Sequence, residues 1–176
     1  MRRLDDIGKE EIRDLLGKGW LTHDGAWFFN TANQFGIDAA NRLNKAAIQT
    51  IAPLEMQRTR KLLGLSEEGI ESFHEIKEFA LESFELILPG SVVSRFHIEA
   101  PSANVIHWEW EAGECFAYKG MQRLGLLDGY ECGVIYRLEC WFEALGLPFE
   151  VEPKITSCIM HTQGACSGDF RFSLPL

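Results

Sequence analysis

The hydrophobic positions in the first part of the chain recur with the period of an α-helix. Residues 5–16 carry apolar side chains on one side, and we expect a short helix there that ends at Gly17 and Gly19. A longer helix is predicted to begin near Thr22, a residue type that suits an N-cap, and to break around Gly36. The beginning of the chain is therefore predicted to be helical.

Two further helical patterns follow. Residues 37–63 place apolar side chains on one helical face, and Pro53 is expected to kink or interrupt this helix because proline lacks the N–H donor and clashes with the preceding turn. Gly64 is a plausible end for it. Residues 70–84 carry another apolar face, and the Pro-Gly pair at 89–90 is a turn signal that ends this helix.

After this turn the pattern changes from helical to alternating. Residues 92–99 and 104–111 alternate between apolar and polar side chains and are rich in β-formers, and Pro101 lies between them, so the two segments predict a hairpin. The remaining segments predict two helices and then two strands, at residues 114–126, 132–145, 149–161 and 170–174.

These elements predict a single α+β domain over residues 1–176. Residues 1–90 form its helical part. Residues 91–176 form a β-β-α-α-β-β module with a four-stranded antiparallel sheet, on which the N-terminal helices pack. A length of 176 residues is usual for one domain, and 46% hydrophobic residues provide material for a packed core.

The charge pattern argues against nucleic acid as the main partner. The chain has 26 acidic and 17 basic residues, for a net charge of −9, and no clustered basic face is visible. No segment approaches the run of about 18 apolar residues that spans a membrane, and the N-terminus lacks the apolar run of a secretory signal. We therefore expect a soluble, cytoplasmic protein that binds neither nucleic acid nor membranes.

Five cysteines stand in the second half of the chain, at positions 115, 132, 140, 158 and 166. In a reducing cytosol, such cysteines are more often metal ligands or core thiols than disulfides. Cys158 and Cys166 flank the sequence HTQGA, which predicts a turn between the last two strands, with Gly164 giving the backbone freedom for it. The two thiols are therefore expected to face one another.

Two thiols of this kind would form half of a tetrahedral zinc site. Cys132 is a candidate third ligand, because it begins a predicted helix and a helix N-terminus lowers the pKa of a thiol. The fourth ligand could come from the strand sequence HWEWE, where His107, Glu109 and Glu111 share one face. The alternative is that the cysteines are buried core thiols.

The ending TSCIMHTQGACSGDFRF resembles the close of the 4-vinyl-reductase-type domain, with Cys158, Gly164, Cys166 and Phe170 in the family's positions. The aromatic-sensing domains of XylR-like and phenol-responsive regulators share that fold and hold zinc through three cysteines and one glutamate. The resemblance covers residues 91–176. It implies a zinc site formed by Glu109, Cys132, Cys158 and Cys166, in which Glu111 or His107 could replace Glu109.

The N-terminal stretch from HDGAWF to KLLGL looks like an uncharacterised bacterial and archaeal family, with L-2-amino-thiazoline-4-carboxylate hydrolases as more distant relatives. This resemblance implies an enzymatic alternative, a hydrolase or reductase-type enzyme acting on a small cyclic substrate. A cysteine nucleophile in such an enzyme would need a base, for which His161 and His107 are candidates. No GxSxG, HExxH, Walker or GxGxxG motif supports catalysis.

The hypothesis favoured by the sequence is a protein that binds a small apolar or aromatic molecule and carries a structural zinc ion, and the sequence leaves open whether it also catalyses a reaction. The ligand would lie between the sheet and the N-terminal helices. Its candidate lining residues are His23, Trp27, Phe28, His97, Trp108 and Trp110. A third hypothesis is a homodimeric assembly module, by analogy with vesicle-tethering subunits of the same fold, pairing through the face of Phe73, Ile76 and Phe84.

Overall fold

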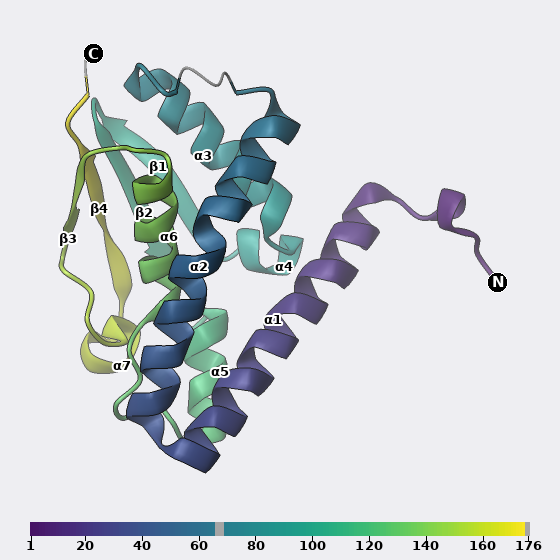
Figure 1. Ribbon diagram of the computed structural model, residues 1–176, viewed down its shortest axis with the longest axis vertical. Coiled ribbons are helices and arrows are strands. Elements are labelled where there is room, and N and C mark those ends of the chain that lie inside the picture. The colour runs from purple at the N-terminus through teal and green to yellow at the C-terminus, as the bar shows by residue number, and fades with distance from the viewer. Residues whose placement is uncertain (66–68, 175–176) are drawn as a thin grey trace.

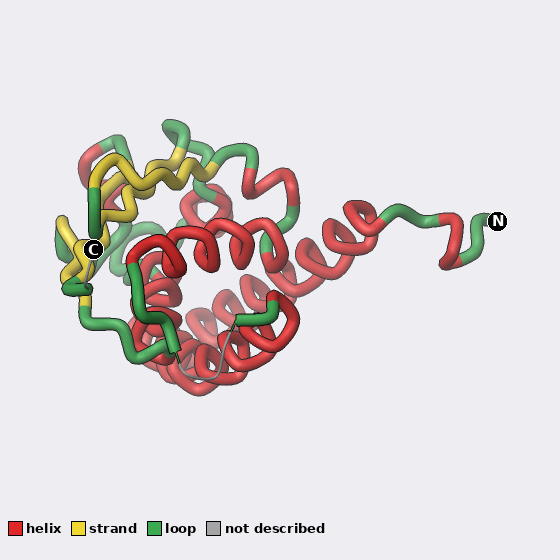
Figure 2. Tube along the Cα trace, turned by 90° about the horizontal axis from the view of Figure 1, so that it is seen from above, coloured by secondary structure: helices red, strands yellow, loops and turns green. Residues whose placement is uncertain are grey.

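The computed structural model describes residues 1–65 and 69–174 of the chain (Figure 1). A four-stranded antiparallel sheet forms one layer, and the long helices lie on one side of it (Figure 2). The expected α+β class and antiparallel sheet are thus confirmed. Among the described residues, no helix combines the length and the apolar character that a bilayer-spanning segment requires.

The first long helix, α1, runs without interruption from Lys9 to Phe35 and follows a short 3-10 turn, η1 (Leu4–Asp6). The predicted division into two helices at Gly17 and Gly19 is therefore wrong. A helical glycine costs only about 1 kcal/mol relative to alanine, which tertiary packing can offset. Gly17 also allows a close approach, because a Cβ there would lie 2.9 Å from the ring of Pro89.

The second long helix, α2, spans Ile37–Leu63, so the predicted bounds are confirmed. Gly36 separates it from α1 with a φ of 86°, and Gly64 ends it in the left-handed conformation with a φ of 74°. Pro53 lies inside this helix and does not interrupt it. The two long helices form a hairpin on the outside of the helical layer (Figure 1).

Two shorter helices connect this hairpin to the sheet. Helix α3 spans Phe73–Ile87 and begins with a capping box, in which Ser72 Oγ accepts a hydrogen bond from the Glu75 N–H, and the Glu75 carboxylate accepts one from the Ser72 N–H. Helix α4 (Gly90–Val93) follows directly and occupies the start of the segment predicted as the first strand.

The strands are β1 (Phe96–Ser102), β2 (Val105–Trp110), β3 (Phe149–Glu152) and β4 (Cys166–Phe172), in the spatial order β1-β2-β4-β3. The hairpin of β1 and β2 was predicted. Between β2 and β3 lie the two predicted helices, α5 (Phe116–Leu124) and α6 (Gly133–Ala144).

The predicted strand over residues 149–161 is wrong in its second half. Strand β3 ends just before Pro153, which has no N–H to donate to a sheet ladder. The chain then forms the short helix α7 (Ile159–Gln163), whose Ile159 and Met160 are buried in the core. Strand β4 begins at Cys166, earlier than the predicted residue 170.

The core lies between the inner face of the sheet and the helices. Trp108 and Phe170 are 0% and 1% exposed, and their ring centroids are 4.8 Å apart. Phe142 of α6 packs edge-on against Phe170 at 5.0 Å. One contiguous cluster of buried side chains extends from Phe28 in α1 to Phe172 in β4, so the helices and the sheet share a core.

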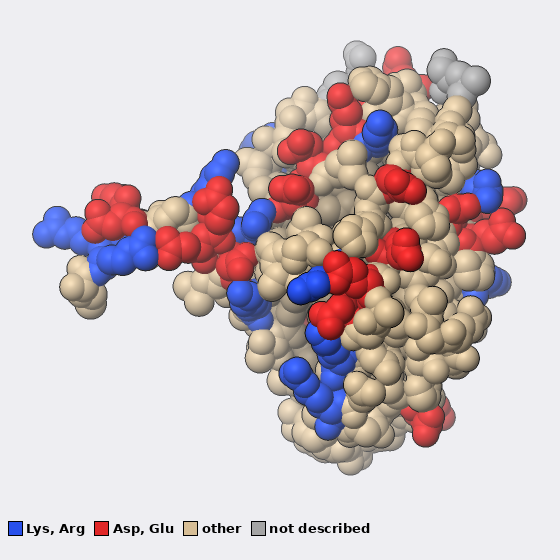
Figure 3. Space-filling view, turned by 180° about the vertical axis from the view of Figure 1, so that it is seen from behind, with Lys and Arg blue, Asp and Glu red and all other residues tan. Residues whose placement is uncertain are grey.

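Charged side chains of both signs are interspersed over the back of the molecule and along the N-terminal segment, which protrudes from the body (Figure 3). That face carries no large continuous basic patch.

Candidate ligand cavity and thiol cluster

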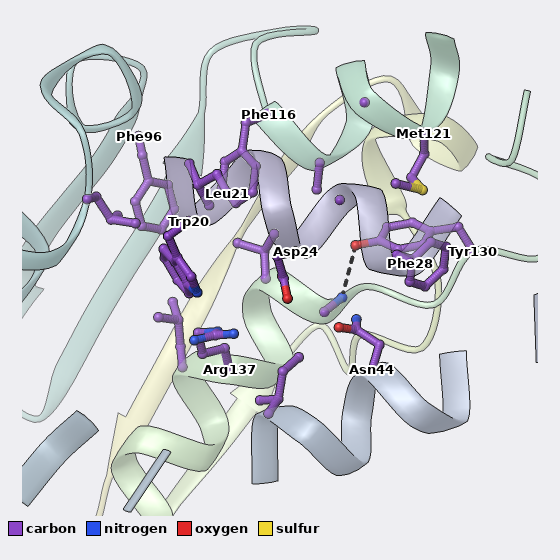
Figure 4. A pocket seen from close by; sticks show the side chains of 18 of the residues that line it. Trp20, Leu21, Asp24, Phe28, Asn44, Phe96, Phe116, Met121, Tyr130 and Arg137 are labelled. Carbon is purple, nitrogen blue, oxygen red and sulfur yellow. Dashed lines mark hydrogen bonds between the residues drawn. The ribbon is translucent and has the colours of Figure 1, made fainter. Parts of the chain in front are cut away.

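A cavity of about 160 Å³ lies where α1, α2, α5 and α6 meet the ends of β1 and β2 (Figure 4). Its wall is mostly apolar. Aromatic side chains from seven different segments contribute to it: Trp20, Phe28, Phe84, Phe96, Trp110, Phe116, Tyr130 and Trp141. Because these segments are distant in sequence, the cavity exists only in the folded chain.

The aromatic wall is held by ring-to-ring packing. Phe96 and Trp110 stack with centroids 4.6 Å apart, and Phe116 meets Trp110 edge-on at 5.9 Å. On the other side of the cavity, Phe28 meets Tyr130 edge-on at 5.4 Å. These contacts fix the rings and therefore the shape of the cavity.

The positive charge in the wall, Arg137 of α6, is already balanced. Its Nη1 donates a hydrogen bond of 2.6 Å to the Glu55 carboxylate, and the Trp141 Nε1–H donates another of 2.6 Å to the same carboxylate. The guanidinium also lies over the ring of Trp20, 4.6 Å from its centroid. Arg137 and Glu55 therefore form a largely buried pair between α6 and α2.

Two other polar side chains in the wall, Asp24 and Asn44, form no hydrogen bond or ion pair with another residue that the structure describes. Figure 4 shows the Asp24 carboxylate directed into the space between Arg137 and Asn44. The Tyr130 hydroxyl has a partner, since it accepts a hydrogen bond of 3.2 Å from the Gly133 N–H.

The structure brings two of the six predicted ligand residues, Phe28 and Trp110, into this cavity. Trp108 lies fully buried in the core instead. His23 and Trp27 line a shallow depression on the outer side of α1, where Trp27 is 66% exposed. His97 lies in another depression, between β1 and α3.

The sequence interpretation missed Trp20, Asp24, Asn44 and Arg137. Trp20, Asp24 and Phe28 are spaced four residues apart and so share one face of α1. That spacing was present in the sequence, but the predicted break between residues 16 and 22 concealed it.

Four of the five cysteines lie at the starts of four elements. Cys115, Cys132 and Cys158 are the N-cap residues of α5, α6 and α7, and Cys166 is the first residue of β4. The prediction that Cys132 begins a helix is confirmed. The prediction that Cys158 and Cys166 flank a strand-turn-strand is wrong, because α7 lies between them.

The electrostatics of the thiols show that they are neighbours. The pKa of Cys132 is raised to about 11, chiefly by burial and to a smaller extent by a charge on Cys158. Burial likewise raises the pKa of Cys166 to about 12, with added effects from Cys132 and Cys158. Burial raises the pKa of Cys115 as well, and charges on Cys132 and Cys166 act in the same direction. Cys115, which the sequence interpretation left out, therefore belongs to this thiol cluster.

Glu109, the predicted fourth zinc ligand, does not join the thiol cluster. In the register of β2 and β4, Trp110 lies opposite Cys166, whereas Glu109 lies opposite Ser167 and is exposed. Side chains alternate across a strand, so Glu109 points away from the face that carries the Cys166 thiol.

The two other strand candidates for that ligand have partners of their own. His107 Nδ1 lies 2.7 Å from an Asp169 oxygen, and Glu111 accepts a hydrogen bond of 2.5 Å from Arg95. His161, the other candidate base, contacts Asp128 at 3.1 Å. Over residues 1–65 and 69–174 no histidine side chain is hydrogen-bonded to a cysteine.

A buried indole N–H points to the cluster. Trp108 Nε1 is buried and has no hydrogen-bond partner of ordinary geometry. The indole nevertheless acts on the Cys166 thiol and lowers its pKa, although the larger effect of burial raises that pKa. Gly168 leaves space for this ring, because a Cβ at that position would lie 2.4 Å from it. In the described part of the chain, no group of three or more Cys, His, Asp or Glu side chains is arranged to hold a metal ion.

Residues 5–90 match the model of a family of unknown function (DUF6125). This region contains α1, α2 and α3 and supplies Trp20, Asp24, Phe28 and Asn44 to the cavity. No curated protein and no solved structure matches the chain. The resemblance of residues 91–176 to the 4-vinyl-reductase-type domain stays a prediction.

Proposed function

We propose that this protein binds a small, mainly apolar molecule in the cavity between α1, α2, α5 and α6. The observation that carries the proposal is a cavity of about 160 Å³ with an aromatic wall and a few polar groups directed inward. An apolar protein cavity of roughly 150 Å³ accepts one benzene molecule. The expected ligand is therefore the size of a single substituted ring.

The test is a thermal-shift screen of one-ring compounds against the wild type and two glycine variants. Gly25 lines the cavity and Gly19 does not, and at both positions on α1 a Cβ would meet open space. Gly25→Leu should fold, fill the cavity and abolish the shift, whereas Gly19→Leu should keep it. A shift that survives Gly25→Leu, or its absence in the wild type, would contradict the proposal.

We also propose that Cys115, Cys132, Cys158 and Cys166 hold a structural zinc ion. Four thiols from four elements supply the soft ligands that zinc prefers, and because the described residues do not already surround one metal position, binding would draw these thiols closer together. The unpartnered Trp108 N–H supports the fit, since a metal-bound thiolate at Cys166 is a stronger hydrogen-bond acceptor than a thiol. A zinc ion with four protein ligands has no open position for water, so its role would be to join α5, α6, α7 and β4.

This ligand set differs from the one that the family resemblance implies, and metal analysis of the purified protein separates the two. We expect one zinc per chain in the wild type, in Glu109→Gln and in Cys140→Ser, whose cysteine is the one outside the cluster. Cys115→Ser should lose it. Zinc lost from Glu109→Gln but retained in Cys115→Ser would support the implied set, and a metal-free wild type would make the cysteines core thiols.

The homodimer stays a prediction, but the face expected to form it is not free. Ile76 and Phe84 of α3 are 1% and 6% exposed, because they pack against the core of their own chain.

A further inference from the structure

We infer that the cavity selects ligands in which the apolar ring carries a protonated amine, with Asp24 as the counter-ion. The inference rests on the proposed function, since it concerns the ligand of the same cavity. It follows from the balance of charge in the wall, from the character of the rings and from the polar atoms that remain unpaired.

The charge balance of the wall is negative. Asp24 and Arg137 are the charged residues that line the cavity. Glu55 neutralises Arg137 at 2.6 Å, and these two side chains are only 14% and 12% exposed. Asp24 has no ion-pair partner in residues 1–65 and 69–174. One negative charge is therefore left facing the cavity.

The rings around Asp24 favour a cation as well. The faces of aromatic rings carry partial negative charge and attract ammonium groups, most strongly for tryptophan and tyrosine. Figure 4 shows Asp24 with Trp20 on one side and with Phe28 and Tyr130 on the other. An amine next to Asp24 would therefore be attracted by the carboxylate and by the rings of Phe28 and Tyr130, whereas the Trp20 ring already carries the Arg137 guanidinium.

The other ligand classes fit less well. An anionic ligand would be repelled by Asp24, and to reach Arg137 it would have to compete with Glu55. A neutral hydrocarbon would cover the Asp24 carboxylate without giving it a hydrogen bond, which is unfavourable. An ammonium group has three donors, and Asn44 offers it an amide oxygen beside Asp24.

The test compares three probes of nearly equal size by isothermal titration calorimetry at pH 7: benzylamine, benzyl alcohol and benzoate. In the wild type we expect benzylamine to bind about tenfold more tightly than benzyl alcohol, and benzoate to bind most weakly. Asp24→Asn should reduce the affinity for benzylamine to that for benzyl alcohol. Asp38→Asn makes the same charge change at an exposed position of α2 outside the cavity and should leave the order unchanged.

The outcomes separate this inference from the proposed function. If benzyl alcohol binds the wild type as tightly as benzylamine, the amine preference is refuted while ligand binding in the cavity stands. If benzoate binds most tightly, Arg137 rather than Asp24 selects the ligand, and the inference is also refuted. If none of the three binds, the inference and the proposed function fail together. An equal loss of benzylamine affinity in Asp24→Asn and Asp38→Asn would assign the effect to net charge and overturn the role of Asp24.

Discussion

Replacing Glu55 by alanine tests the charge balance on which the selectivity of the cavity depends. In the wild type its carboxylate accepts hydrogen bonds of 2.6 Å from both Arg137 and Trp141. Alanine removes both acceptors at once. It leaves the Arg137 guanidinium without a counter-ion at a position where that side chain is only 12% exposed.

The expected loss follows from the burial of the pair. Removing one partner of a buried ion pair costs about 3–5 kcal/mol, whereas an exposed pair contributes about 0.2–1 kcal/mol. Water in the cavity can rehydrate part of the guanidinium, so we expect Glu55→Ala to lower the free energy of unfolding by about 3 kcal/mol. Glu55→Gln keeps one acceptor for Arg137 or Trp141 but no charge, and should cost about 1–2 kcal/mol.

Urea unfolding followed by far-ultraviolet circular dichroism measures these differences, provided that its slope with urea is unchanged. The double variant Glu55→Leu/Arg137→Met replaces the pair by apolar side chains and should come within about 1 kcal/mol of the wild type. If Glu55→Ala costs less than about 1 kcal/mol, the pair is solvated. Arg137 would then not be neutralised by Glu55 alone, and the charge balance argued for Asp24 would not hold.

Two further predictions concern α1 and α6. Gly17→Ala should lower the melting temperature, because its Cβ would lie 2.9 Å from the buried ring of Pro89. Gly19→Ala, whose Cβ would have no atom within 4 Å, should raise the free energy of unfolding by up to about 1 kcal/mol. Two shifts of the same sign would contradict this packing. Burial, and then the charge of Glu143, raise the pKa of Glu139. The folded protein therefore loses stability as the pH rises through this raised pKa, because the carboxyl of Glu139 then becomes charged at a partly buried position. Glu139→Gln should therefore unfold at higher urea than the wild type at pH 7 but not at pH 4, and an advantage of equal size at both pH values would refute the assignment.

Local patterns in the sequence were sufficient to predict most of the secondary structure. The bounds of α2 were predicted because its apolar period is uninterrupted and Gly36 and Gly64 stand at its ends. The single helix α1 was not predicted, because Gly17 and Gly19 are typical of the end of a helix. What makes Gly17 tolerable is the ring of Pro89, 72 positions later in the chain, and no local pattern contains that contact.

The candidate site shows the same division between local and long-range information. The position of Cys132 at a helix start is a local property and was predicted. The exclusion of Glu109 depends on strand register, which places Trp110 opposite Cys166. The inclusion of Cys115 depends on the tertiary fold, which brings the start of α5 within electrostatic reach of Cys132 and Cys166. A shift of the register by one residue would reverse which side chains face the core. The sequence allowed either face of the HWEWE strand to be the inner one.

Helix α1 forms one wall of the cavity, but few of its residues are buried. Of its 27 residues, only Gly17, Phe28, Thr31 and Ala32 are buried, and its first turns protrude from the body (Figure 2). Segments with few buried contacts open locally at a lower free energy than the global one. We therefore expect a bound molecule to leave by transient detachment of α1 from α5 and α6, while the sheet stays intact. Ligand residence time and amide hydrogen exchange in α1 would then report the same opening equilibrium.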